Sequence, residues 1–310
     1  MKIFTHNFNP NSNSGPNKFS RQLFQSMIKD NGVVIESNNK EADVEFCLIQ
    51  QQVHKVKPML LRLDGIWFNS EQDYDSQNAP IKYAYGNADA VVFQSNFNKA
   101  LTEKWFGEHR NSFVIHNAPD LEVIKSVNPR FFDRVFGVNT EVWSCASKWR
   151  PHKRLNENIR YFFENAPKEA VLAVAGPISG ENLVIPDSGR VYLLGDLDYV
   201  SLLSLYRRSS TFIHLSYLDH CPNVVVDAQA SGCHIICSST GGTKEIVSNG
   251  TIIHEKNWDY SPIKLYEPPA MDFKNKSEVF SHQCEDKKTN IVDCANLYYN
   301  VFKTISSKEG

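Results

Sequence analysis

The sequence predicts an α/β protein made of two Rossmann-like domains. Three observations lead to this prediction. Short apolar runs alternate with helical patterns along the chain, an order typical of parallel sheets covered by helices. This alternating series occurs twice. The chain has 310 residues, a length at which a single hydrophobic core usually divides into two domains.

The first half begins with a strand, KIFT, which is followed by a polar loop and a helix, KFSRQLFQSMIKDNG. The helix places Phe19, Leu23 and Met27 on one face. Gly32 ends it, because glycine readily adopts the left-handed backbone that terminates helices. Ser95 is placed to cap a second helix, NFNKALTEKWF, which is closed by a glycine. The other predicted strands of this half are VVIE, EFCLI, MLLRL, AVVFQ and FVIH.

The second half repeats this order. Strands are predicted for EVWSCAS, AVLAVAG, VYLLG, TFIHL and HIICS, and helices for RLNENIRYFFENAP, YVSLLSLYRRS and VVVDAQASG. In the middle helix we expect a buried stripe of Leu202, Leu205 and Tyr206. Residues 257–278 are rich in proline, tyrosine and charge, and we expect an irregular loop there. The tail regains helical periodicity, with one apolar side made of Ile291, Cys294, Leu297, Tyr298 and Phe302.

Composition narrows the classes of function. The net charge of −2 argues against a nucleic-acid binder, which would carry clustered basic residues. The first residues lack the apolar core of a signal peptide, and no run approaches the ~20 apolar residues of a membrane span. The seven cysteines are scattered and include no CxxC pair, so we expect reduced thiols and a cytoplasmic location.

The loop after TFIHL is the first candidate site. Asp219 and Asp227 flank a turn that leads into a helix starting near Pro222. The exposed N–H groups and dipole of a helix start can hold a phosphate, and carboxylates accept hydrogen bonds from sugar hydroxyls. The spacing alone equally fits a plain loop acid followed by a helix acid, and that alternative is the commoner one.

The loop after EVWSC holds the densest positive cluster, with Lys148, Arg150, Lys153 and Arg154 around His152. Cations at the start of a helix oppose its dipole, and a bound anion would remove this conflict. The pattern therefore favours an anion site, although a solvated helix face would look similar.

Three further loops follow predicted strands. The loop NSNSGPNK contains Gly15, which permits close approach of a ligand. Arg62 and Asp64 end the strand MLLRL, and their arrangement suits either a cleft or a structural ion pair. The turn SSTGGTKE carries paired glycines before Glu245. We find no sequence motif typical of a metal site, a P-loop or a serine nucleophile.

These stretches together resemble family 4 glycosyltransferases, which have the GT-B fold. The segment LSYLDHCPNVVVDAQASGCHIICSSTGGTKEIV is similar to the family signature, in which two glutamates have seven residues between them. Here both glutamates are aspartates, Asp219 and Asp227. SKWRPHKRL resembles the family's diphosphate-binding loop, with Lys148 and Lys153 at the matching positions. The resemblance is strongest from Val142 to Val247.

The resemblance implies roles for particular residues. Lys148 and Lys153 would stabilise the leaving diphosphate, Arg150 would contribute to donor binding, and Asp227 would bind the ribose. Asp219 would bind hydroxyls of the donor sugar. Gly15 matches the family's first-domain glycine loop, and Asp64 stands about where the family has a histidine. The backbone that would contact donor sugar and phosphate belongs to Cys221, Pro222, Asn223 and Val224.

The expected function is therefore metal-independent transfer of a hexose-type sugar, with retention, from a nucleotide-diphosphate sugar to a glycan, lipid or other hydroxyl acceptor. The donor itself is the substrate and no cofactor is expected. Residues 1–135 would form the acceptor-side domain and 136–286 the nucleotide-sugar domain, with their sheets facing a cleft between them. Residues 287–310 would form a helix that crosses back to the first domain.

Two alternatives stay open, a nucleotide-sugar 2-epimerase with the same fold and a non-catalytic nucleotide-sugar-binding protein. The expected partners are a nucleotide sugar and a carbohydrate or lipid-linked acceptor. No nucleic acid and no transmembrane segment are expected, and the sequence leaves room for peripheral contact with a membrane.

Overall fold

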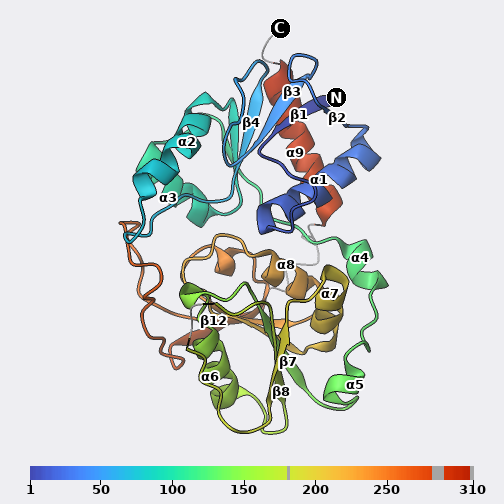
Figure 1. The fold of residues 1–310 in the computed structure, drawn as a ribbon, viewed down its shortest axis with the longest axis vertical. Coiled ribbons are helices and arrows are strands. Elements are labelled where there is room, and N and C mark those ends of the chain that lie inside the picture. Colours follow the sequence, from blue (N-terminus) through green and yellow to red (C-terminus); the bar gives the residue numbers. More distant parts are fainter. Residues whose placement is uncertain (180–181, 281–289, 308–310) are drawn as a thin grey trace. The chain divides into compact units, whose positions relative to one another are not determined.

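The computed structural model describes residues 1–179, 182–280 and 290–307 (Figure 1). The chain divides into two compact units. Unit 1 contains residues 1–118, 260–263 and the C-terminal segment from residue 289, and unit 2 contains residues 119–259 and 264–288. Each unit has its own parallel sheet, so the fold class expected from the sequence is confirmed.

Unit 1 is built on a parallel sheet of six strands in the order β2-β1-β3-β4-β5-β6, counted over the described residues. Strands β3, β4 and β5 are buried along their whole length, as central parallel strands are. The elements of unit 1 are β1 (Lys2–His6), α1 (Gly15–Asn31), β2 (Val34–Glu36), β3 (Val44–Leu48), β4 (Met59–Leu63), α2 (Tyr74–Asn87), β5 (Ala90–Phe93), α3 (Asn96–Phe106), β6 (Ser112–Val114) and α9 (Ile291–Ser306).

The helix ends of unit 1 follow local sequence signals. Gly32 ends α1 with φ 64°, and the Ser95 hydroxyl caps α3 by accepting from the Asn98 N–H at 3.1 Å. Helices α1 and α9 lie side by side (Figure 1) and share one core with β1, β3, β4 and β5. In α9, Cys294, Tyr298 and Phe302 are buried in this core, whereas Leu297, expected on the same side, is 48% exposed.

Unit 2 is built on a seven-stranded sheet in the order β13-β12-β11-β10-β7-β8-β9, again within the described residues. All its pairings are parallel except that of β12 with β13. Its elements are α4 (Leu121–Ser126), α5 (Asp133–Phe136), β7 (Val142–Ala146), η1 (Pro151–Lys153), α6 (Leu155–Asn165), β8 (Val171–Ala175), β9 (Val191–Gly195), α7 (Tyr199–Arg208), β10 (Thr211–His214), α8 (Asn223–Ala230), β11 (His234–Ser238), η2 (Thr243–Glu245), β12 (Asn249–Ile253) and β13 (Lys276–Phe280).

Successive side chains of the unit 2 strands point into different cores, as the two-residue period of a strand requires. Val142 and Ala146 of β7 pack with helices α4, α5, α7 and α8. Trp143 and Cys145 pack with helix α6 and with Met271. The sheet is therefore covered on both faces, and its strand ends are the edges that loops can occupy.

The structure differs from the sequence-based expectation at several elements. Helix α2 was not expected, because it buries only four of its residues and carries Pro80 in its interior. Strand β13 begins within the segment expected to be an irregular loop and extends two residues beyond it, and its mostly exposed side chains gave no apolar alternation. In α7, Leu205 and Tyr206 are buried, but Leu202 is only partly buried.

The unit boundary also differs from the expected division at residues 135 and 136. Residues 119–135 lie in unit 2, because Ile124, Val127 and Phe132 pack in its core. Arg207 reinforces this placement by donating to the backbone carbonyls of Lys125 at 3.1 Å and Val127 at 3.0 Å. The expected division between residues 286 and 287 lies outside the described residues.

Candidate functional site

Three loops of unit 2 meet at one edge of its sheet. They follow β7, β10 and β11, which are adjacent parallel strands, so their carboxyl ends share that edge. Hydrogen bonds join the loops: the Tyr217 N–H donates to the His152 carbonyl at 2.8 Å, and the Gly242 N–H donates to the Asp219 carbonyl at 2.7 Å. In parallel α/β sheets this edge is where ligands bind.

Asp219 is at the centre of the polar side chains that these three loops bring together. Its Oδ2 accepts from the Lys153 ammonium at 2.6 Å and lies 3.1 Å from Nε2 of His214, while its Oδ1 accepts from the His220 N–H at 2.9 Å. Burial opposes the charged carboxylate, but the Lys153 charge and the His214 hydrogen bond outweigh burial and hold the pKa of Asp219 well below its usual range. Asp219 is therefore a charged acceptor at neutral pH.

The backbone around Asp219 is tightly fitted to the glycine turn after β11. Leu218 has φ 56° and Gly241 has φ 77°, both in the left-handed region. A Cβ at Gly241 would lie 2.3 Å from the carbonyl oxygen of Asp219 and 2.8 Å from its nitrogen. Only glycine permits this approach, which explains the first of the two glycines in this turn, Gly241.

We expect Gly241→Ala to lower the free energy of unfolding by about 3 kcal/mol or more, because it adds a backbone clash to left-handed strain. Gly189→Ala is the matched control: its φ is 65°, but nothing lies within 4 Å of its Cβ position, so only the strain of ~1–2 kcal/mol remains. Denaturant unfolding of both variants measures the difference. Equal losses would show that the approach to Asp219 is not tight.

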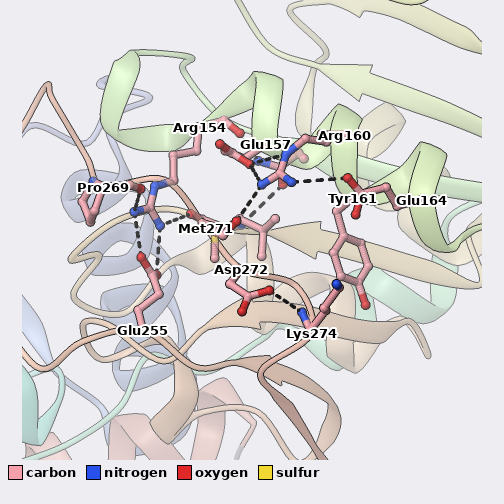
Figure 2. A network of polar contacts seen from close by, with 12 residues as sticks. Arg154, Glu157, Arg160, Tyr161, Glu164, Glu255, Pro269, Met271, Asp272 and Lys274 are labelled. Carbon is pink, nitrogen blue, oxygen red and sulfur yellow. Dashed lines mark hydrogen bonds and ion pairs between the residues drawn. The ribbon is translucent and has the colours of Figure 1, made fainter.

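The basic side chains of the loop after β7 differ in their exposure to solvent. Lys148 and Arg150 are exposed, and Lys153 is partly exposed beside Asp219. Arg154, expected in the same anion-binding cluster, is instead 3% exposed and forms a bidentate ion pair with Glu255 at 2.8 and 2.9 Å (Figure 2). Its left-handed φ of 54° turns the chain into α6 and directs its side chain inward, so its role is structural.

His152 lies next to Lys153 and packs 5.4 Å from the ring of Tyr266. Burial, aided by the charges of Lys153 and Arg150, lowers the pKa of His152 to about 3. Burial also lowers the pKa of His214, although its hydrogen bond to Asp219 opposes that shift. Both imidazoles are therefore neutral at neutral pH, and the positive charge of the group comes from lysine and arginine.

The lowered pKa of His152 predicts that the free energy of unfolding decreases at acidic pH. Because its folded pKa lies below the ordinary value of 6.5, the unfolded state binds the extra proton as the pH falls. Stability is full above pH ~6.5 and falls below it, by up to ~1.4 kcal/mol per pH unit for this one group. We expect His152→Gln to flatten the unfolding free energy between pH ~6.5 and ~4. A slope identical to that of the unsubstituted chain would contradict this assignment.

Helix α8 begins directly after the Asp219 loop. Its N-cap is Pro222, which provides no side-chain cap, and no acidic residue lies in its first turn. A helix start of this kind attracts anions. Cys221 and Pro222 are buried, whereas Asn223 and Val224 are partly exposed.

Asp227 lies in α8 and is 6% exposed. It accepts a hydrogen bond from the Tyr199 hydroxyl of α7 at 3.4 Å. The structure thus places Asp227 on the helix that follows the Asp219 loop, as the sequence predicted. The contribution of α7 was not expected, because a tyrosine at a helix start carries no sequence signal for a site.

Two predicted residues belong to unit 1. Gly15 is the first residue of α1. Asp64 follows β4, and its Oδ1 lies 2.5 Å from Nη1 of Arg62, whose side chain is fully buried. Arg62 also donates to Asn117 at 2.9 Å, and Gln94 donates to the Asp64 carbonyl at 2.6 Å. Polar side chains at or after the carboxyl ends of β4, β5 and β6 thus gather at one edge of this sheet. Sequence reasoning missed Gln94 and Asn117.

Within residues 1–179, 182–280 and 290–307, no group of three or more His, Cys, Asp or Glu side chains could hold a metal ion. In the same residues no helix has the length and apolar character needed to cross a membrane.

Comparison with known proteins agrees with this geometry. Residues 148–261 match the family model described as Glycosyl transferases group 1. Over these residues the chain is similar to a group 1 glycosyltransferase domain. This domain contains Lys148, Lys153, Asp219 and Asp227. No curated protein matches the sequence significantly.

Solved structures support the fold. The chain is similar to Anabaena Alr3699/HepE in complex with UDP-glucose, with 14% identity, a TM-score of 0.62, and coverage of 99% of this chain and 98% of the other. It is also similar to sucrose-phosphate synthase from Thermosynechococcus elongatus, with 12% identity, a TM-score of 0.65, and coverage of 100% and 97%. The GT-B fold and the glycosyltransferase class expected from the sequence are confirmed.

Proposed function

We propose that this glycosyltransferase is a family 4 enzyme that transfers a hexose-type sugar, with retention, from a nucleotide-diphosphate sugar to a hydroxyl acceptor on a glycan or lipid. The observation that carries the proposal is the convergence of Lys153, Asp219 and the start of α8 at one sheet edge, inside the group 1 domain. Cations and a helix start suit a diphosphate, and carboxylates suit sugar hydroxyls.

Each residue has a proposed role that follows from its surroundings. The Lys153 ammonium has three N–H donors, one of which serves Asp219, so others remain for the leaving diphosphate. Exposed Lys148 and Arg150 add charge from the same loop. Preorganised cations stabilise the charge that develops on a leaving group, so we propose that the reaction needs no metal. The donor is the substrate, and the proposal includes no cofactor.

The two aspartates take different parts of the donor in this proposal. Asp227 binds the ribose, and Asp219 binds hydroxyls of the transferred sugar. Three hydrogen bonds already hold the Asp219 carboxylate, and a carboxylate has about four lone-pair directions. Asp219 thus offers one fixed acceptor direction to the sugar.

Gly15 is proposed to take part in binding the donor, and Asp64 is proposed to act on the acceptor side. Asp64 is held by buried Arg62, and its side chain remains 23% exposed, which leaves an acceptor for a substrate hydroxyl. Six buried free thiols among the described residues support a reducing, cytoplasmic setting for the enzyme.

A thermal-shift screen of UDP-, GDP- and ADP-sugars tests the proposal. A donor present at 100 times its Kd should stabilise the fold by ~2.7 kcal/mol, and free sugars should cause no shift. The stabilising donor is then incubated with hydroxyl acceptors and the products are separated by chromatography. Transfer supports the proposal. Release of nucleotide with an epimerised sugar in the absence of an acceptor would identify an epimerase. Binding without turnover would identify a non-catalytic protein. The absence of any binding would refute the donor site.

A further inference from the structure

His214 is the last residue of β10 and lies directly beneath the Asp219 loop. It is 3% exposed, and its ring stacks on that of Phe212 at 6.3 Å with an interplanar angle of 13°. The stacking and burial fix the plane of the imidazole. In this orientation Nε2 lies 3.1 Å from Oδ2 of Asp219.

The same oxygen of Asp219 accepts from the Lys153 ammonium at 2.6 Å. The charged or titratable groups near the His214 ring are therefore Lys153 from η1 and Asp219 from its own loop, with the neutral ring of His152 close by. A neutral imidazole has one N–H and one bare nitrogen. Beside a carboxylate oxygen the N–H belongs on Nε2, which makes His214 a donor to Asp219.

We propose that His214 is a positioning residue that fixes the Asp219 carboxylate in one orientation, so that Asp219 keeps its place when Lys153 engages a diphosphate. The Lys153 side chain is a flexible four-carbon stem whose ammonium shifts when it also binds the diphosphate, whereas the buried, stacked imidazole is held in place. This inference rests on the proposed donor site. Because Asp219 is proposed to contact the transferred sugar, loss of the His214 hydrogen bond should weaken binding of the sugar half of the donor and leave binding of the nucleoside diphosphate half unchanged.

The test compares two variants of His214. His214→Phe keeps an aromatic ring stacked on Phe212 but removes the N–H, and His214→Gln keeps an N–H at a similar reach. The control is His234→Phe, on the neighbouring strand β11 but at its amino end, away from the loops. Calorimetry measures the Kd of each protein for a nucleotide sugar and for its nucleoside diphosphate.

We expect His214→Phe to raise the Kd for the nucleotide sugar by about 10-fold, the effect of one charge-assisted hydrogen bond, and the Kd for the nucleoside diphosphate by less than about 2-fold. His214→Gln should recover most of the loss, and His234→Phe should behave as the unsubstituted chain. Equal losses for both ligands would show a merely structural role. An unchanged Kd for the nucleotide sugar, or no recovery with Gln in a folded protein, would also overturn the proposal.

A ligand-free measurement separates this inference from the proposed function. In ¹⁵N-labelled protein, the His214 ring should show a fixed Nε2–H tautomer that is lost in Asp219→Asn. If the chain binds no nucleotide sugar but shows this tautomer, the proposed function fails while the His214–Asp219 contact stands. A His214 ring that averages between tautomers in the unsubstituted protein would overturn the positioning role itself.

Discussion

Lys153→Ala is expected to weaken nucleoside diphosphate binding by about 100-fold, a loss of ~2.7 kcal/mol. The ammonium is the cation that contacts Asp219 and lies in the loop that joins β7 to α6. Its removal takes away a charge-assisted contact to the ligand and also leaves the Asp219 carboxylate facing the ligand phosphates without a neutralising partner. Both effects act against an anionic ligand.

Calorimetric titration of the nucleoside diphosphate measures this loss. Lys168→Ala provides the control, because it removes the same charge from an exposed lysine that precedes the amino end of β8. Lys153 instead follows the carboxyl end of the parallel strand β7. We expect Lys168→Ala to bind within about 2-fold of the unsubstituted chain, since distant surface charges are screened. Similar affinities for Lys153→Ala and Lys168→Ala would refute the assignment of Lys153.

Arg154→Ala is expected to destabilise unit 2 by about 3–5 kcal/mol, because it leaves a buried carboxylate without its partner. The side chains of Arg154 and Glu255 are 2% and 6% exposed. The guanidinium also donates to the Pro269 carbonyl at 2.8 Å and lies 4.8 Å from the ring centroid of Tyr217. Glu255 in turn accepts from the Ser238 hydroxyl. One side chain thus joins the segment before α6, the end of β11 and the segment after β12.

Arg160→Ala is the matched control for this loss. Arg160 lies in α6 (Figure 2) and forms ion pairs with Glu157 and Glu164 of the same helix. It also donates to the Met271 carbonyl at 2.8 Å. Its side chain is 43% exposed, so we expect a loss of only ~1 kcal/mol. Urea unfolding followed by tryptophan fluorescence compares the two. Equal losses of unfolding free energy in the two variants would contradict a larger contribution of the buried ion pair.

Much of the fold could be predicted because its signals are local. Mainly apolar runs such as Val44–Leu48 and Met59–Leu63 are typical of central parallel strands, and the structure has them at the centre of the unit 1 sheet. Helix α2 and strand β13 could not be predicted, since their burial depends on distant partners and leaves no strong periodicity. The unit boundary was misplaced for the same reason, because residues 119–135 join unit 2 only through tertiary contacts.

The candidate site was predicted to a similar extent. The loops after β7 and β10 were identified from charge and helix signals in the sequence, and the structure brings Lys153 and Asp219 into contact across 66 positions of the chain. Sequence spacing could not reveal that Arg154 turns inward, since a left-handed φ at one residue decides it. The contact of His214 with Asp219 was missed as well, because a histidine at a strand end is more often a satisfied core residue.

The most direct test of the central claim is a crystal structure of the chain grown with the nucleoside diphosphate of its stabilising donor. We predict that the diphosphate lies within hydrogen-bond distance of the Lys153 ammonium and of backbone N–H groups at the start of α8, with the ribose beside Asp227. A diphosphate bound elsewhere on the chain, with the Lys153–Asp219 loops unchanged and unoccupied, would contradict the account.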